Sequence, residues 1–193
     1  MPISPIFQTL GDHDNADEVE GWGPFICDIN SAWLGLGYYF WDYHIQLGHW
    51  WGKRRYGEDK YIICKAFCEI TPERCWDLHS EGAHREEFIK ALSLLSESGI
   101  AEESEITVAQ VIEYAKLNGF FNHEAIRVHG INSAKMCNEF DVGARLLFST
   151  TNRIAYYDLY PAVQICLITK KSLSLRNYLI VWPEMYVQPD TVF

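Results

Sequence analysis

The sequence predicts an α+β fold with a mainly antiparallel sheet and a helical insertion near residues 80–119. Runs rich in β-branched and aromatic residues flank this insertion, and such runs favour strands. Strands and helices do not alternate regularly along the chain, as they would in a doubly wound parallel sheet. No repeat, low-complexity segment or Pro/Ser-rich linker divides the chain. We therefore expect residues 1–193 to form one domain.

Eight segments are expected to form strands, and these are residues 4–10, 37–41, 60–70, 75–78, 125–130, 144–149, 162–168 and 177–182. A short helix is expected at residues 43–51, because Tyr43, Leu47, Trp50 and Trp51 share one helical face. Asp42 precedes it and is its expected N-cap.

Two longer helices are expected within the insertion. Residues 83–98 carry apolar side chains at helical spacing and are followed by Gly99. Residues 107–119 begin with Thr107 and Gln110 at the spacing of a capping box and end at a glycine.

The charge balance argues against two classes of partner. The formal net charge is −10 at pH 7, which disfavours a nucleic-acid backbone or an anionic membrane as the main partner. The compact basic cluster at residues 53–55 is too short to reverse this. No apolar run approaches a membrane span, and residues 1–12 show no signal-peptide pattern. We expect a cytoplasmic protein, or an effector delivered without a signal peptide.

The six cysteines are expected to be reduced core thiols. Cys64, Cys68, Cys137 and Cys166 lie within apolar runs, and the cysteine density is low for a disulfide-stapled fold. The spacing Cys64-x3-Cys68-x6-Cys75 lacks the close cysteine pairs of a structural zinc site, so no metal site is predicted.

Aromatic residues are concentrated in one stretch. Eight of the nineteen residues from Trp33 to Trp51 are Trp, Tyr or Phe, and Gly35 and Gly37 precede the densest part. The stretch is consistent with an aromatic core or with a surface that holds a flat ligand. The two interpretations are compatible if alternate residues of the strand point to opposite faces of the sheet. Tyr39 and Trp41 would then lie on one face, and Tyr38 and Phe40 on the other.

The segment Gly35–Trp41, GLGYYFW, resembles the G-x-G-x-Y-F strand of ADP-ribosyltransferases of the poly(ADP-ribose) polymerase and diphtheria-toxin type. Residues 60–78 are also similar to small bacterial relatives, in which a long strand leads to a Leu-Asp-Leu-like corner, here Cys75–Leu78. The resemblance covers about residues 5–80 and 123–183. It implies a split, mainly antiparallel sheet and NAD as substrate.

The resemblance also implies a set of NAD-binding residues. Tyr39 matches the tyrosine that stacks on the nicotinamide ring in that family. The turn that usually reads His-Gly-Thr is represented by Gln8, Thr9, Leu10 and Gly11, and His13 just beyond it is an alternative. The remaining cofactor-binding residues implied by the strand and its trailing helix are Gly37, Tyr38 and Trp50.

The family's catalytic glutamate is replaced in this chain. Its position corresponds to Gln164, which can hold a ribose hydroxyl but carries no charge. Loss of such a charge-stabilising interaction costs on the order of 10²–10³ in rate. Four acids lie near this strand in the sequence and can substitute: Glu139, Asp141, Asp158 and Glu184.

Three functions therefore stay open. The first is NAD-dependent ADP-ribosyl transfer to a macromolecular or nucleobase acceptor, with Tyr39 and Gln164 in the catalytic centre and release of nicotinamide. The second is a non-catalytic module of the same fold that binds a nucleotide or a protein partner. The third is a structural or interaction protein with an aromatic core. Arg127 and His129, two residues apart on a strand, either contact a phosphate or adenine or line a polar sheet face.

Overall fold

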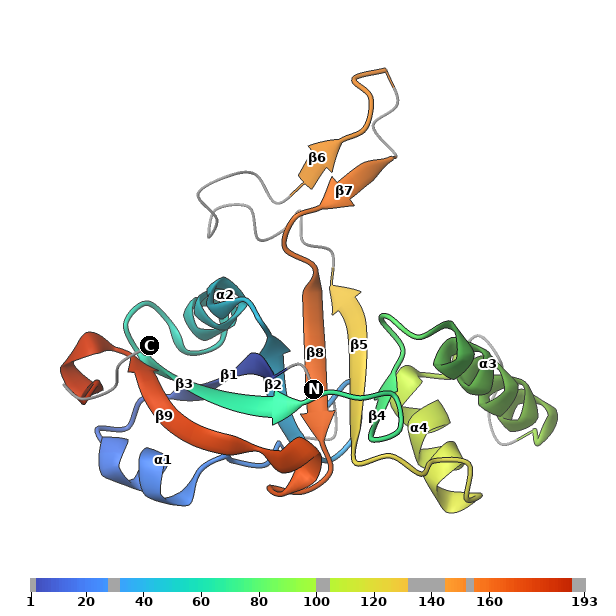
Figure 1. The fold of residues 1–193 in the computed structure, drawn as a ribbon, viewed down its shortest axis with the longest axis horizontal. Coiled ribbons are helices and arrows are strands. Elements are labelled where there is room, and N and C mark those ends of the chain that lie inside the picture. The colour runs from blue at the N-terminus through green and yellow to red at the C-terminus, as the bar shows by residue number, and fades with distance from the viewer. Residues whose placement is uncertain (1–2, 28–31, 100–104, 132–144, 152–154, 189–193) are drawn as a thin grey trace.

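A computed structural model describes residues 3–27, 32–99, 105–131, 145–151 and 155–188. Its centre is a seven-stranded sheet of order β4-β5-β8-β2-β1-β3-β9 (Figure 1). The strands are β1 (Ile3–Gly11), β2 (Tyr38–Asp42), β3 (Tyr61–Glu69), β4 (Cys75–Asp77), β5 (Ala125–Ile131), β8 (Ala162–Leu167) and β9 (Arg176–Trp182). Among the described residues of this sheet, β4 and β5 pair in parallel and every other pair of neighbouring strands is antiparallel. The predicted α+β class with a mainly antiparallel sheet is confirmed.

Four α-helices are present in the described residues: α1 (Ala16–Trp22), α2 (Ile45–Tyr56), α3 (Gly82–Glu97) and α4 (Val108–Leu117). The last two form the predicted helical insertion. At the start of α4, Thr107 and Gln110 form the reciprocal hydrogen bonds of a capping box. Gly99 and Gly119, just beyond α3 and α4, adopt positive φ angles of 68° and 74°, which glycine tolerates best.

Each face of the sheet has its own core. The face with α2, α3 and α4 buries Trp41, Leu47 and Tyr61 on one side and Trp76 and its neighbours on the other. The opposite face buries a cluster around Ile6, Phe40 and Leu173 and a second cluster around Val19 of α1. Alternate residues of β2 divide between the faces as predicted, because successive side chains of a strand point in opposite directions.

The sheet diverges between β1 and β2. These strands pair at only two positions, Ile6 with Asp42 and Phe7 with Trp41, whereas β1 pairs with β3 at nine positions. Beyond Phe7 the Gln8 side chain reaches from β1 toward β2 and donates to the Tyr39 carbonyl at 3.4 Å. Residues 25–27 lie at this divergence, and Cys27 forms an isolated bridge with Gly37, just before β2.

One local prediction is wrong, and two local elements of the structure were not predicted. Asp42 is not the N-cap of α2, because that position belongs to His44 and the Asp42 carboxylate binds Arg127 instead. Helix α1 was not predicted, since it is seven residues long and buries only Val19. A separate two-stranded ribbon pairs β6 (Arg145–Leu147) with β7 (Tyr156–Asp158), of which only β6 was predicted. Figure 1 shows this ribbon projecting from the sheet.

The cysteines of the described residues are free thiols. Cys64, Cys68, Cys75 and Cys166 are buried, and Cys27 is half-buried. Burial raises the pKa of the thiols of Cys64, Cys68 and Cys166 to about 12. These thiols are therefore protonated core groups near neutral pH. Cys137 lies outside the described residues.

Candidate functional site

A cavity of about 260 Å³ opens where β1 and β2 diverge. Its walls come from β1, from segments 25–27 and 32–33, from β2, from the C-terminal part of α2 and from Gln164 of β8. We call it the divergence pocket. It exists because the two strands separate after Phe7, so that no ladder of hydrogen bonds closes the sheet at this point.

Five of the predicted site residues line this pocket: Gln8, Thr9, Leu10, Tyr39 and Gln164. They come from three strands that are neighbours in the sheet order β8-β2-β1, which explains how positions so distant in sequence meet. An NAD site of the expected kind requires residues of these three strands to meet at one cavity, and these five residues do so.

The other predicted residues lie elsewhere. Tyr38 packs against the core on the opposite face of the sheet, and Trp50 packs edge-on against Trp41 with ring centroids 6.2 Å apart. Gly37 lies so close to β8 that an added Cβ would be 2.4 Å from the Cys166 Sγ. Gly11 pairs with Tyr61 at the end of β1.

Tyr39 is half-buried, and its hydroxyl is fully engaged. The Leu34 N–H donates to the Tyr39 Oη at 2.7 Å, and this hydroxyl donates to the Gly35 carbonyl at 2.7 Å. Burial is the largest cause that raises the pKa of this phenol, followed by the nearby Cys166. The hydroxyl therefore holds the turn at residues 34–35, and the ring is the part of Tyr39 that remains for contact with a ligand.

The Gln8 amide is hydrogen-bonded entirely to groups of the protein itself. Its amide nitrogen donates to the Phe25 and Tyr39 carbonyls at 2.8 and 3.4 Å. Its amide oxygen accepts from the Phe25 N–H at 2.9 Å and from the Tyr178 hydroxyl at 2.8 Å. These four bonds use the whole capacity of a primary amide. Gln8 therefore shapes the pocket by holding Phe25 against β1, and its amide has no group left for a ligand.

Thr9 and Gln164 have polar groups left for a ligand. The Thr9 hydroxyl donates to the Gly48 carbonyl at 3.1 Å, which leaves its oxygen lone pairs as acceptors. The half-buried Gln164 amide has no hydrogen-bond partner among the described residues. Within the pocket, these are the two predicted residues that can bond a hydroxyl of a ligand.

The sequence reasoning missed the aromatic and basic walls from neighbouring elements. Trp33 is 45% exposed and meets Trp51 edge-on, with ring centroids 6.2 Å apart. Arg55 and Tyr56 line the pocket from the last turn of α2. The signal was present in the sequence, because Trp51, Arg55 and Tyr56 lie at helical spacing. The expected helix ended at residue 51, whereas α2 continues to Tyr56, and residues 53–55 were considered only as a short basic cluster.

The charge of the pocket is positive at its rim. Arg55 forms no ion pair with the described residues, and no Asp or Glu is present in the described lining. Two of the acids proposed to replace the family glutamate lie outside this lining, since Asp158 is on β7 and Glu184 follows β9. Glu139 and Asp141 lie outside the described residues.

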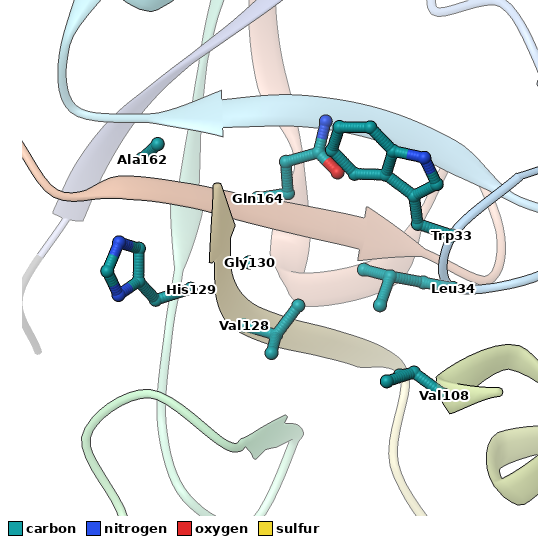
Figure 2. A pocket seen from close by; sticks show the side chains of 8 residues that line it. All are labelled: Trp33, Leu34, Val108, Val128, His129, Gly130, Ala162 and Gln164. Atoms are coloured by element: carbon teal, nitrogen blue, oxygen red, sulfur yellow. The ribbon is translucent and has the colours of Figure 1, made fainter. Parts of the chain in front are cut away.

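A second cavity of about 360 Å³ adjoins the divergence pocket, and both are lined by Trp33 and Gln164. Figure 2 shows Trp33 and Leu34 at one end of this cavity and His129 and Ala162 at the other. Apart from His129 and Gln164, its lining is apolar. Arg127 lies outside it, since its guanidinium binds Asp42 and Asp77.

Comparisons with protein-family models, curated proteins and solved structures find no match for this chain. Within the described residues, no helix combines the length and apolar character needed to cross a membrane. The same residues contain no group of three or more His, Cys, Asp or Glu side chains arranged to hold a metal ion.

Proposed function

We propose that the chain is an ADP-ribosyltransferase-like module that binds an NAD-type nucleotide in the divergence pocket. The observation that carries this proposal is the convergence of Thr9, Tyr39 and Gln164, from three strands, on one aromatic-walled cavity. The resemblance of Gly35–Trp41 to the family strand supplies the identity of the ligand.

The chemistry of the walls suits the nicotinamide riboside end of the ligand. An aromatic wall attracts a flat cationic pyridine ring by stacking and through the ring quadrupole. The Gln164 amide and the Thr9 oxygen supply the two groups that bond ribose hydroxyls. Arg55 at the rim supplies a planar, permanently charged partner for a phosphate. The volume of about 260 Å³ holds this end of the ligand, and the remainder lies outside the pocket.

Binding without rapid turnover is the function that this geometry supports best. Nicotinamide leaves a ribose whose positive charge the family stabilises with a glutamate, and the described pocket presents Gln164 without any carboxylate. Transfer is the second candidate. It is supported by Gln164 itself, which lines the pocket at the position that matches the family glutamate and whose amide makes no hydrogen bond with the described residues.

The test is calorimetric titration with NAD, combined with a nicotinamide-release assay on the same samples. We expect saturable NAD binding that Gln164→Ala weakens about tenfold, because one hydrogen bond to a ribose hydroxyl contributes roughly 1–1.5 kcal/mol. Trp33→Ala should weaken binding as well, and Trp22→Ala, which removes a tryptophan 72% exposed and outside the pocket, should not.

The two candidates separate in the release assay. A binding module forms nicotinamide no faster than buffer does, and Gln164→Glu then leaves the rate unchanged or creates a slow activity. A transferase releases nicotinamide in the wild type and loses this with Gln164→Ala. Absence of NAD binding by a folded wild-type protein would refute the proposal in both forms.

A further inference from the structure

A separate polar pocket of about 240 Å³ lies on the opposite face of the sheet. Six of its residues carry polar side chains: Ser4, Asp42, Tyr43, His44, His79 and Arg127. Asp42 follows Trp41 on β2, so its side chain points away from the face that carries Gln164 and the divergence pocket. We call it the acid–imidazole pocket. Neither the sequence resemblance nor the proposed nucleotide site uses it.

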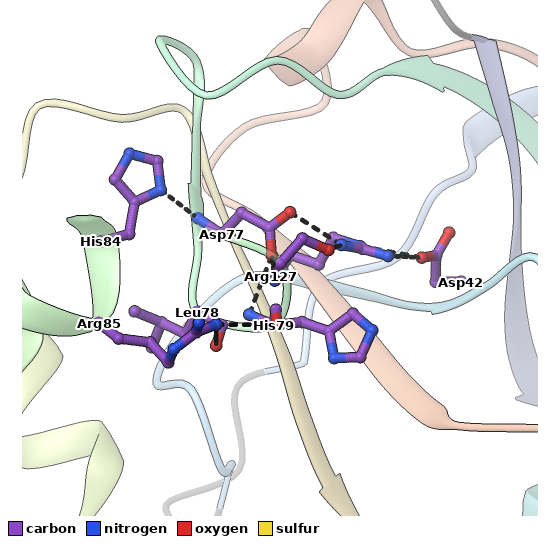
Figure 3. A network of polar contacts seen from close by, with 8 residues as sticks. Asp42, Asp77, Leu78, His79, His84, Arg85 and Arg127 are labelled. Carbon is purple, nitrogen blue, oxygen red and sulfur yellow. Dashed lines mark hydrogen bonds and ion pairs between the residues drawn. The ribbon is translucent and has the colours of Figure 1, made fainter. Parts of the chain in front are cut away.

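Arg127 is already neutralised by two carboxylates. Its Nε and Nη2 donate to Asp42 Oδ2 at 2.9 and 2.7 Å. Its Nη1 donates to Asp77 Oδ2 at 2.8 Å and to Ser80 Oγ at 2.7 Å. Figure 3 shows the guanidinium held between the two carboxylates. Four of the five guanidinium N–H groups are thus engaged, and an incoming anion would meet two acids beside this arginine.

Asp42 lines the pocket, and one of its carboxylate oxygens is not bonded by Arg127. Its side chain is 9% exposed, and both bonds from Arg127 end on Oδ2. No hydrogen bond among the described residues reaches Oδ1. Asp42 lines the pocket, so Oδ1 is the oxygen of this nearly buried carboxylate that the Arg127 bonds leave for a ligand.

Two imidazoles supply further acceptors. His44 and His79 are half-buried, and their ring nitrogens make no hydrogen bond with the described residues. Burial is the largest cause that lowers the pKa of each ring, and for His79 the neighbouring Arg127 adds to it. Both rings are therefore neutral near pH 7, and each offers one nitrogen lone pair.

The summed charge around the pocket is negative. Among the described residues, the charged groups that line it are Asp42 from β2 and Arg127 from β5. Asp77 from β4 is bonded to the same arginine, and Asp158 of β7 acts on His44 from nearby. His129 of β5 also lies beside His79, with ring centroids 5.9 Å apart. With neutral imidazoles, the carboxylates outnumber the single arginine.

The rim carries a strained aromatic residue. Tyr43 adopts a positive φ of 62°, is 65% exposed and meets the His44 ring edge-on at 5.2 Å. This backbone region is strained for a bulky residue, and such residues cluster at ligand sites. The aromatic ring of Tyr43 therefore lies beside His44 in the pocket lining, where it can contact a cation.

We propose that the acid–imidazole pocket is a binding site for an alkylammonium group. Asp42 Oδ1 accepts one N–H, the imidazoles of His44 and His79 accept others, and the Tyr43 ring contacts the adjoining methylenes. An organic cation fits better than a metal ion, since the described side chains form no metal-ligating group of three. The volume of about 240 Å³ limits the occupant to a short chain or an amino-acid side chain.

The test uses putrescine as the cation and 1,4-butanediol as its uncharged counterpart, by calorimetric titration at pH 7.5. We expect putrescine to bind and butanediol to bind at least tenfold more weakly. Asp42→Asn should weaken putrescine binding at least tenfold, and Asp17→Asn on the exposed surface of α1 should leave it unchanged. At pH 5 the protonated imidazoles should weaken binding further.

A second variant keeps the test decisive if Asp42→Asn does not fold. His79→Phe retains a flat ring beside His129 but removes the nitrogen acceptor, so it should weaken putrescine binding several-fold without touching the Arg127 ion pairs. Equal binding of putrescine and butanediol, binding of inorganic phosphate in place of putrescine, or unchanged affinity in His79→Phe would overturn the proposal.

Discussion

Replacement of Arg127 by Met should be strongly destabilising. The Arg127 side chain is 15% exposed, and its partners Asp42 and Asp77 are 9% and 8% exposed, so the change leaves two nearly buried carboxylates without a counter-charge. Removal of one partner from a buried ion pair costs about 3–5 kcal/mol, and most of this is the penalty for the unpaired charge. We expect the free energy of unfolding, measured by urea denaturation, to fall by about this amount.

The same reasoning predicts a rescue. Arg127→Met combined with Asp42→Asn and Asp77→Asn removes the unpaired charges and should recover most of the loss, so the three substitutions are strongly non-additive. Arg74→Met is the control, because Arg74 binds Glu124 where the two side chains are 29% and 42% exposed. Arg74→Met should lower the free energy of unfolding by about 1 kcal/mol or less. A loss below about 1 kcal/mol for Arg127→Met, or no rescue by the two amides, would refute the view that desolvated charge dominates here.

Three further outcomes are expected. Thr107→Ala removes the capping-box hydroxyl of α4 and should lower the free energy of unfolding by about 1 kcal/mol in urea denaturation, whereas Thr151→Ala, in a different exposed turn, should change it little. Gly37→Ala should lower the free energy of unfolding by about 1–3 kcal/mol through overpacking, because the new Cβ would be 2.7 Å from the Leu167 carbonyl oxygen. Thermal melts measure this loss against Gly21→Ala, whose new Cβ would meet nothing within 4 Å. Burial raises the pKa of the Cys64, Cys68 and Cys166 thiols from 9.0 to about 12, so the folded state holds these protons where the unfolded state loses them. The free energy of unfolding should therefore fall above pH 9 by about 1.4 kcal/mol per pH unit for each thiol, and in native protein at pH 8 mass spectrometry should find a thiol reagent on Cys27 and not on these three. Rapid labelling of the buried thiols, or stability independent of pH between 9 and 11, would contradict this assignment.

Periodicity within the sequence was sufficient for most of the secondary structure. Helices α3 and α4 were predicted because their apolar faces repeat at helical spacing, and the capping box at Thr107 is a purely local device. The strands of the main sheet were predicted because β-branched and aromatic residues occur in short bounded runs. Helix α1 and strand β7 were not predicted, since segments of seven and three residues carry too little pattern to be distinguished from a loop.

The partners of polar side chains were decided by the tertiary structure alone. Asp42 is locally a good helix N-cap, but Arg127, 85 residues away, offers it a charge-assisted bond in a buried setting. Gln8 was predicted to face a ligand, yet its amide is used completely by Phe25, Tyr39 and Tyr178. A sequence pattern specifies which face a side chain takes, and it does not specify which distant group competes for its hydrogen bonds.

The sequence by itself determined the α+β class, the helical insertion, the division of β2 between two faces and the set of strands that would have to meet. Only the tertiary structure decided that β1 and β2 separate after Phe7, that Gln164 and Thr9 keep polar groups open to the resulting cavity, and that Arg127 is neutralised on the other face. The reason is physical. Local periodicity arises from backbone geometry, which each short segment carries, whereas cavities and ion pairs arise from packing among segments far apart in the chain.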